Sequence, residues 1–433
     1  MDIILLSFGD FFRGIRQALS LLGDVWYFLF PPILYPLFKT FWMDHIQLRY
    51  ARTLSFVLLE IVPPKEMEKS PKPMESVFSG LVGVAKGFST VELFVQGQFP
   101  VSFSLEIVSE GGEVHFYIRT QKSFRNLVEA HFYAQYPDME ITEVPDYVTR
   151  VPSTIPNGEW DLWGTDFKFT KPDLYPIRTY PAFEEDVTGK MIDPLAGLIE
   201  SMGRLAPGQN IWFQMIIAPE EDAWYKKGQA IVDDFLGKPK KESSGGILAM
   251  VWHDFIDVLS NIIPAFVSTA TFSPFQKKAE AKQEQPLEFR LSPGQKEVLK
   301  ALERNLGKQM YKTKMRMLYV GKRDGFDKSF VSMFMGALKQ FNDMNLNGFA
   351  PDGDSKTYAQ YLFVNERLRY RQRRIFRRYI SRDPDPTGKM FELSIEELAT
   401  LFHMPDFSVM APALTRVAAK RSNAPANLPI LEE

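Results

Sequence analysis

The feature that most constrains this chain is an uncharged apolar stretch near its N-terminus. Residues 25–38 read VWYFLFPPILYPLF without a charged side chain, and the longer run 18–38 is interrupted only by Asp24. A membrane-spanning helix needs about 20 apolar residues, so the length is just sufficient. Three prolines would kink such a helix, which membrane helices tolerate better than soluble ones. We therefore expect a membrane anchor here.

Residues 1–23 place apolar side chains at helical spacing, which predicts an amphipathic, interfacial helix before the anchor. No small-residue cleavage site follows the apolar run, which argues against a signal peptide. Two other interpretations stay open: a buried helix of a soluble core, and a re-entrant or monotopic hairpin turning at the paired prolines. The expected anchor residues are Trp26, Phe28, Phe30, Pro31, Pro32, Leu34 and Phe38.

Basic residues on the two sides of the anchor indicate its orientation. Arg13 and Arg16 precede it, whereas Lys39, Arg49 and Arg52 follow it. The slight excess after the anchor favours a cytoplasmic C-terminal bulk. We expect a single-pass or monotopic protein of the inner (cytoplasmic) membrane, with membrane lipid as one partner.

Composition and motifs restrict the chemistry. Of 433 residues, 45% are apolar and 24% charged, as in ordinary globular proteins, and the net charge is −2. The chain has no cysteine, which excludes disulfides, cysteine-ligated metals and thiol nucleophiles. No Walker A, dinucleotide-binding or G-x-S-x-G pattern occurs, and the five histidines are not paired at metal-binding spacing. We expect a non-enzymatic protein without cofactor or metal.

After residue 52 the sequence alternates between strand and helix patterns. The expected elements are a strand at 52–62, a helix at 73–86, strands at 101–110 and 113–120, a helix at 123–137 and a strand at 139–144. Gly111-Gly112 between the middle strands is a hairpin signal. This order predicts a ferredoxin-like (split βαβ) domain over residues 52–145.

A second α/β domain is expected over residues 146–345, after a loop at 146–165. Its elements are a strand at 167–172 or 175–181, a helix at 193–205, a strand at 210–219, helices at 221–237 and 292–307, a strand at 312–322 and a helix at 327–343. The polar composition of about 237–290 indicates a flexible insertion, within which residues 246–272 form either an interfacial helix or a packed one. The predicted fold class is therefore α+β: a membrane-associated N-terminal helix, two α/β lobes and a basic helical C-terminal region at 346–433.

The densest charge lies in ERLRYRQRRIFRRYISR, residues 366–382, which holds eight arginines including Arg382. Arginine binds phosphate bidentately and stacks on rings, so the pattern predicts contact with a DNA backbone or with anionic lipid headgroups. The third interpretation is a solvated helix whose acidic partner lies elsewhere on the protein or on another subunit. The expected nucleic-acid or phosphate-binding residues are Arg367, Arg369, Arg371, Arg373, Arg374, Arg377 and Arg378.

Several segments together resemble one family. They are LLEIVPP (58–64), KSPKPMES (69–76), LEIVSEGGEVHFYIRT (105–120), AQYPDMEI (134–141), DPLAGLIESMGRLAPGQNIWFQMIIAP (193–219) and ALKQFNDMNLNGF (337–349). The chain is similar here to the membrane-anchored, pre-motor region of type IV secretion and conjugation ATPases of candidate-phyla bacteria. Its final segments, LSIEELATLFHMP (393–405) and APALTRVAAKRSNAPANLP (411–429), resemble the stretch that leads into a HerA/FtsK-type motor.

The resemblance implies a non-catalytic scaffold or adaptor of a DNA- or protein-translocating apparatus, with residues 393–430 docking the motor. The chain lacks Walker motifs, so the resemblance implies either that the motor ATPase is a separate chain or that this chain was trimmed. A homo-oligomer is expected by analogy with ring assemblies. Two alternatives are a membrane-bound hydrolase that uses His115 or His131, and a peripheral protein that binds anionic lipid.

Overall fold

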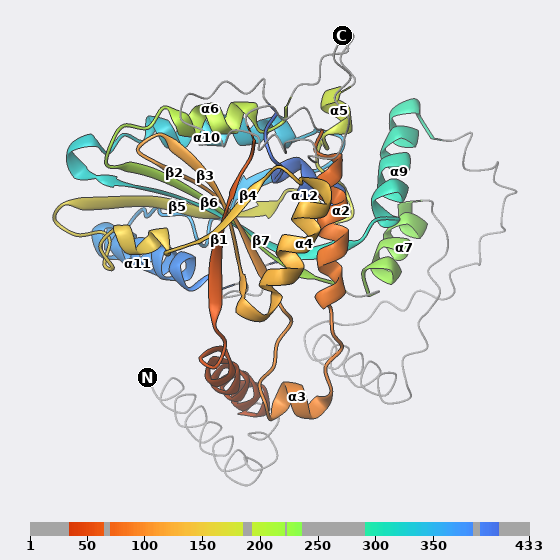
Figure 1. The fold of residues 1–433 in the computed structure, drawn as a ribbon, viewed down its shortest axis with the longest axis horizontal. Coiled ribbons are helices and arrows are strands. Elements are labelled where there is room, and N and C mark those ends of the chain that lie inside the picture. Colours follow the sequence, from red (N-terminus) through yellow and green to blue (C-terminus); the bar gives the residue numbers. More distant parts are fainter. Residues whose placement is uncertain are drawn as a thin grey trace, which may run out of the picture.

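The computed structural model describes residues 34–64, 70–184, 193–220, 223–235, 291–383 and 390–406. Four expected features lie partly or wholly outside these ranges: the amphipathic helix at residues 1–23, the anchor residues Trp26 to Pro32, the 237–290 insertion and the docking tail beyond residue 406. Among the described helices, none combines the length and the apolar character that crossing a bilayer requires. The architecture is α+β, with helices packed on an antiparallel sheet (Figure 1).

One nine-stranded sheet organises the described chain. Its order is β4-β1-β3-β2-β6-β7-β5-β8, with β9 paired to β7, and all of these pairings are antiparallel. The strands are β1 (Phe56–Val62), β2 (Phe103–Glu110), β3 (Glu113–Gln121), β4 (Glu140–Val144), β5 (Trp160–Phe169), β6 (Gln209–Pro219), β7 (Met310–Lys322), β8 (Phe349–Pro351) and β9 (Phe391–Ser394). Strands of the expected 52–145 and 146–345 units thus share one sheet.

The first half of the sheet has the element order that the sequence predicted. Between its strands lie α2 (Lys72–Leu81), the short α3 (Thr90–Phe94) and α4 (Arg125–Gln135), giving β1-α2-β2-β3-α4-β4. Gly111 and Gly112 have φ values of 61° and 99° at the turn between β2 and β3. A two-residue turn with positive φ matches the twist of a hairpin, and glycine adopts it without steric cost. The predicted hairpin is confirmed.

The second half repeats this order. Its strands and two sheet-packed helices, α6 (Ala196–Gly203) and α10 (Ser329–Leu338), run β5-α6-β6-β7-α10-β8, and its strand order β8-β5-β7-β6 matches β4-β1-β3-β2 position by position. The halves meet where β2 pairs with β6, from Phe103 opposite Ile217 to Glu110 opposite Asn210. The connection from β6 to β7 contains α7 (Ala223–Phe235) and α9 (Pro293–Leu306).

The position expected for the first strand of this half was only partly right. β5 begins at Trp160, inside the stretch expected to be a loop, and ends at Phe169, so it shares only residues 167–169 with the strand expected at 167–172. The alternative at 175–181 is not a strand. Pro172, Pro176 and Pro181 lack the backbone N–H that a strand ladder needs, so chain pairing ends before them.

The sheet separates two apolar cores. On one face pack α2, α4, α6, α10 and α12 (Ile395–Leu401); on the other packs α11 (Val364–Ser381). Neighbouring residues of β1 show the alternation, since Leu58 belongs to the core under α11 and Leu59 to the opposite core. The remaining helices are one over residues 34–51, α5 (Pro181–Glu184), and 3-10 turns at Val82–Val84, Lys122–Phe124, Tyr147–Arg150, Arg323–Gly325 and Lys339–Phe341.

Candidate functional site

The predicted arginine helix exists as α11, and its arginines divide into two groups. The side toward the sheet buries Gln372, Ile375, Phe376 and Tyr379. Four arginines are exposed and three are half-buried: Arg367, Arg369, Arg373 and Arg377 in the first group, and Arg371, Arg374 and Arg378 in the second. The sequence did not separate these groups, because arginine occurs on every side of the helix.

Two of these arginines hold a neighbouring loop. Nη1 of Arg371 donates hydrogen bonds to the carbonyl oxygens of Gly353, Lys356 and Tyr358 at 3.1, 3.0 and 2.8 Å. Nη1 of Arg367 donates to the carbonyl of Gln360 at 2.9 Å. Arg371 in particular uses its guanidinium within the protein, so its role is to shape the loop.

The loop presents apolar side chains to solvent. We call residues 358–364 (YAQYLFV) the aromatic loop; Tyr361, Leu362 and Phe363 are 87%, 77% and 74% exposed. Tyr361 and Phe363 have φ values of 68° and 54°, in the left-handed region that bulky residues rarely occupy. At its base, Thr357 exchanges two hydrogen bonds with Gly164 of β5. No sequence pattern indicates this loop, since its exposure cannot be seen in its composition.

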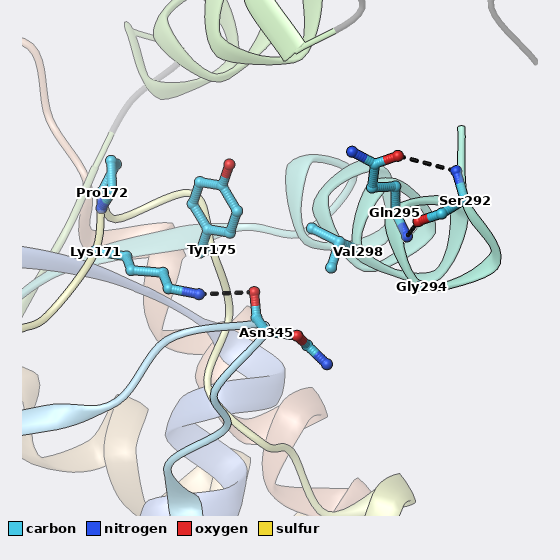
Figure 2. A pocket seen from close by; sticks show the side chains of 8 residues that line it. All are labelled: Lys171, Pro172, Tyr175, Ser292, Gly294, Gln295, Val298 and Asn345. Atoms are coloured by element: carbon cyan, nitrogen blue, oxygen red, sulfur yellow. Dashed lines mark hydrogen bonds between the residues drawn. The ribbon is translucent and has the colours of Figure 1, made fainter. Parts of the chain in front are cut away.

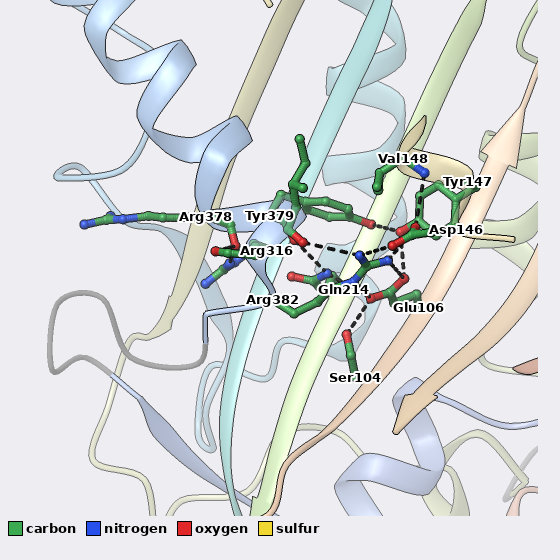
Figure 3. Close-up of polar contacts among 12 residues, drawn as sticks. Ser104, Glu106, Asp146, Tyr147, Val148, Gln214, Arg316, Arg378, Tyr379 and Arg382 are labelled. Carbon is green, nitrogen blue, oxygen red and sulfur yellow. Dashed lines mark hydrogen bonds and ion pairs between the residues drawn. The ribbon is translucent and has the colours of Figure 1, made fainter. Parts of the chain in front are cut away.

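The end of α11 is fastened to the sheet by a buried charge network (Figure 3). Glu106 of β2, fully buried, accepts hydrogen bonds from Nε and Nη2 of Arg382 at 3.0 and 3.2 Å. Arg382 also forms an ion pair with Asp146. The acidic partner that one interpretation expected for the arginines therefore exists for Arg382, on β2 and beside β4.

Other polar groups complete the network. Ser104, Gln214 and Tyr147 donate to Glu106 at 2.6, 3.0 and 2.8 Å, and the hydroxyls of Tyr147 and Tyr379 lie 2.7 Å apart. Burial alone would raise the pKa of Glu106, but Arg382 and the hydrogen-bond donors hold it below its ordinary value. Glu106 is thus a buried carboxylate whose charge depends on Arg382.

A second buried cation supports the same end of the helix. Arg316 of β7 donates to the carbonyls of Arg378 and Asp383 at 2.6 and 2.8 Å, and its Nε lies 3.3 Å from Asp166. The Arg378 carbonyl lies in the last turn of α11, and Asp383 follows the helix. The C-terminal end of α11 is therefore fixed to the sheet by Arg316 of β7 and by Arg382, the residue that caps the helix.

The described part of the predicted anchor lies on an exposed apolar helix. Over residues 34–42 every side chain is exposed, including Leu34 and Phe38 of the anchor prediction. Trp42 donates from Nε1 to the carbonyl of Phe94 on α3 at 2.8 Å, which joins the helix to α3. We call the exposed apolar side chains of this region the basal surface: Leu34, Tyr35, Leu37, Phe38, Phe41, Trp42, Leu48, Val91 and Val95.

Two of the pockets among the described residues have polar groups in their linings. A pocket of about 470 Å³ lies between Lys171 and the start of α9 (Figure 2). Three of its polar side chains bond within the protein: Lys171 donates to the Asn345 carbonyl at 2.9 Å, and Ser292 and Gln295 cap each other. The second, of about 310 Å³, is lined by charges of both signs, among them Arg178, Lys300 and Glu396.

The histidines considered for hydrolysis lie in other places. His115 pairs through Nδ1 with Glu60 at 2.7 Å, and the His131 ring lies against Gly80 of α2. Neither lines the two pockets above. Within the described ranges no group of three or more histidine or acidic side chains is arranged to hold a metal ion.

Comparison with protein-family models gives a match over most of the chain. No curated protein matches the sequence. A family model described as a domain of unknown function (DUF8128) matches residues 46–416, which include every strand of the sheet, α11 and the aromatic loop. The chain therefore belongs to the DUF8128 family.

Proposed function

We propose that this chain is a non-catalytic, membrane-anchored scaffold subunit of a type IV secretion-like translocation apparatus, and that it docks a separate motor ATPase of the HerA/FtsK type. The bulk of the chain would face the cytoplasm, at the inner membrane. The observation that carries the proposal is the basal surface, because it continues directly from the uncharged residues 25–33.

The chemistry of the basal surface supports a bilayer as its partner. Tyr35, Phe38, Phe41 and Trp42 bring aromatic rings to one exposed helix, and tyrosine and tryptophan favour the interface between acyl chains and headgroups. Lys39 lies beside them with Nζ 5.4 Å from the centroid of the Phe94 ring, and such a side chain can extend its charge toward headgroups. An exposed apolar surface of this kind in a water-facing position would promote aggregation.

The fold supports a scaffolding role. We infer that each half of the sheet is a ferredoxin-like unit, because each has the strand order 4-1-3-2 with antiparallel neighbours and two helices on one face. The resemblance of residues 393–405 and 411–429 to a motor-linking segment supports docking of the motor near this end. Residues 391–394 pair with β7, so the docking segment would begin from a fixed point on the sheet.

Liposome flotation of the full chain tests the anchor. We expect the wild-type chain to float with vesicles of bacterial lipid, and a variant with Phe28→Asp, Phe30→Asp, Phe38→Asp and Phe41→Asp to stay in the aqueous fraction. Met344→Asp is the matched control, because Met344 is 97% exposed but lies outside the basal surface. Failure of the wild-type chain to float would contradict the proposal.

Photo-crosslinking in cells tests the motor. A photoreactive amino acid at residues between 411 and 429 should capture an ATPase that carries Walker motifs, whereas the same group at Met344 should not. Capture of the same ATPase from both positions, or of none, would refute the docking role.

A further inference from the structure

We propose that α11 and the aromatic loop form a binding surface for single-stranded nucleic acid. This inference rests on the proposed function and would identify nucleic acid as a substrate class of the apparatus. The aromatic-arginine surface consists of Tyr361, Phe363, Tyr370, Arg369, Arg373 and Arg377.

The positive charge of α11 and the loop before it favours a polyanion as the ligand. Residues 356–382 contain nine basic residues and one acidic residue, Glu366, for a local net charge of +8. The whole chain has −2, so all other residues together carry −10. The exposed Arg369, Arg373 and Arg377 follow each other at intervals of four residues, about 6 Å along the helix. A row of guanidinium groups suits a chain of phosphates, each of which it can bind bidentately.

The exposed rings favour a ligand whose own aromatic faces are free to stack on them. Tyr361, Phe363 and Tyr370 are 87%, 74% and 65% exposed, although aromatic rings gain most by burial. Proteins that bind single strands combine a basic track for the backbone with rings on which successive bases stack. In a duplex the base faces are covered by neighbouring pairs, and only base edges are accessible in the grooves. α11 also lies with one side buried on the sheet, so it does not project as a groove-reading helix does.

Hydrogen bonds to backbone carbonyls fix the chain that leads into the aromatic loop before any ligand binds. Arg371 fixes the loop through three carbonyls, and Arg367 fixes it through Gln360. Tyr361 and Phe363 occupy left-handed backbone conformations, which cost free energy and accumulate at binding sites. A preorganised surface loses less conformational entropy on binding.

The position of the surface separates it from the membrane. α11 lies along the flank of the sheet, whereas helix 34–51 and α3 lie at the lower end of the view, beyond the start of β1 (Figure 1). A bilayer at the basal surface therefore leaves the aromatic-arginine surface free for a soluble polyanion.

Fluorescence anisotropy of the full chain in phosphatidylcholine nanodiscs tests the inference. The probes are a labelled oligothymidylate of about 20 nucleotides, longer than a site of roughly 4–16 nucleotides, and an abasic strand of equal length. We expect tighter binding of the oligothymidylate. Tyr361→Asn and Phe363→Asn should each weaken it about 5- to 150-fold and leave abasic binding unchanged. Asparagine tolerates the left-handed backbone, so the loop keeps its shape.

A variant of the three exposed arginines tests whether they bind the phosphates of the strand. Combined Arg369→Gln, Arg373→Gln and Arg377→Gln should weaken binding of both probes and reduce the salt slope by about 2 between roughly 50 and 200 mM salt. Tyr225→Asn and Arg204→Gln are matched controls, being exposed residues on α7 and beside α6, and should change neither affinity.

Three results would overturn the inference. The first is equal affinity for the two probes, and the second is no binding at about 50 mM salt. The third is that the asparagine variants lose binding to phosphatidylglycerol vesicles but keep their affinity for the oligothymidylate. The last result would assign the surface to lipid. A chain that floats with liposomes but does not bind the oligothymidylate refutes this inference alone. A chain that binds it but does not float refutes the membrane anchor alone.

Discussion

Replacing Arg382 by methionine is expected to destabilise the protein severely. The guanidinium donates five hydrogen bonds, two of them to the fully buried Glu106 and two to Asp146. Methionine keeps most of the length but removes the charge, so Glu106 remains buried without a cation. Breaking a buried pair in this way costs about 3–5 kcal/mol. Ser104 and Tyr147 still donate to Glu106, which places the expected loss near about 3 kcal/mol.

Urea unfolding of the full chain in detergent measures this loss. Trp212 is the probe, since its ring centroid lies 5.3 Å from that of Tyr147 and 5.4 Å from that of Tyr379. With an m-value of about 3 kcal/mol/M, the midpoint should fall by about 1 M. Arg204→Met is the control: its exposed pair with Glu200 is worth about 0.3–0.5 kcal/mol, so the midpoint should hardly move.

The loss should also depend on pH in a defined direction. In the wild type the pKa of Glu106 is below its ordinary value, so its contribution is present at neutral pH and is lost in acid. Without Arg382, burial raises this pKa, and the protonated form becomes the stable one in the folded protein. The variant therefore loses stability as pH rises through the raised pKa. Its deficit should be largest at neutral pH and shrink on acidification toward pH 4.5.

A double-variant cycle with Glu106→Gln isolates the pair. Glu106→Gln leaves Arg382 with Asp146, so it should cost less than Arg382→Met, and the combined variant should be more stable than the sum of the single losses predicts. A loss below about 1 kcal/mol for Arg382→Met at neutral pH, or a deficit that grows on acidification, would refute this account of the network.

Three further predictions concern other parts of the fold. Burial raises the pKa of Glu397 to about 7. The stability that its protonated form contributes is therefore fully present in acid and is lost as pH rises through about 7. The urea midpoint of the wild type should fall more between about pH 5 and 8 than that of Glu397→Gln. Gly80→Ala would place Cβ 2.2 Å from Nδ1 of His131 and should cost about 1–3 kcal/mol in thermal unfolding, most of it recovered by adding His131→Ala. Arg371→Met should accelerate amide exchange at residues 353–360, whereas Arg373→Met should leave it unchanged.

Local patterns predicted the first half of the sheet well, because its signals are local. Alternating apolar residues in β2 and β3 and the Gly111-Gly112 turn act over a few positions. The start of β5 differs from the prediction because Trp160 and Trp163 lie in the stretch expected to be a loop, although they pair with Lys322 and Tyr319 of β7. That pairing joins segments far apart in the sequence, and no local pattern reports it.

The arginine helix shows the same limit for the candidate site. The sequence predicts the helix, but it does not predict which of its arginines are exposed and which bond within the protein. Arg382 looks like its neighbours in the sequence, yet its carboxylate partners are Glu106 and Asp146, from distant strands and turns. Arg371 likewise uses backbone carbonyls that only the folded loop supplies. Roles set by long-range contacts are therefore invisible until the fold is known.

The seam between β2 and β6 has a consequence for the history of the chain. Each of these strands is an edge of its own half, and the two edges are equivalent in the repeated order. Two separate copies of one half would pair through the same edges as a symmetric homodimer. The present sheet has the form that duplication and fusion of such a dimer would give. The two halves differ in the segment between β6 and β7, which contains α7 and α9, and in the helix over residues 34–51 that precedes β1.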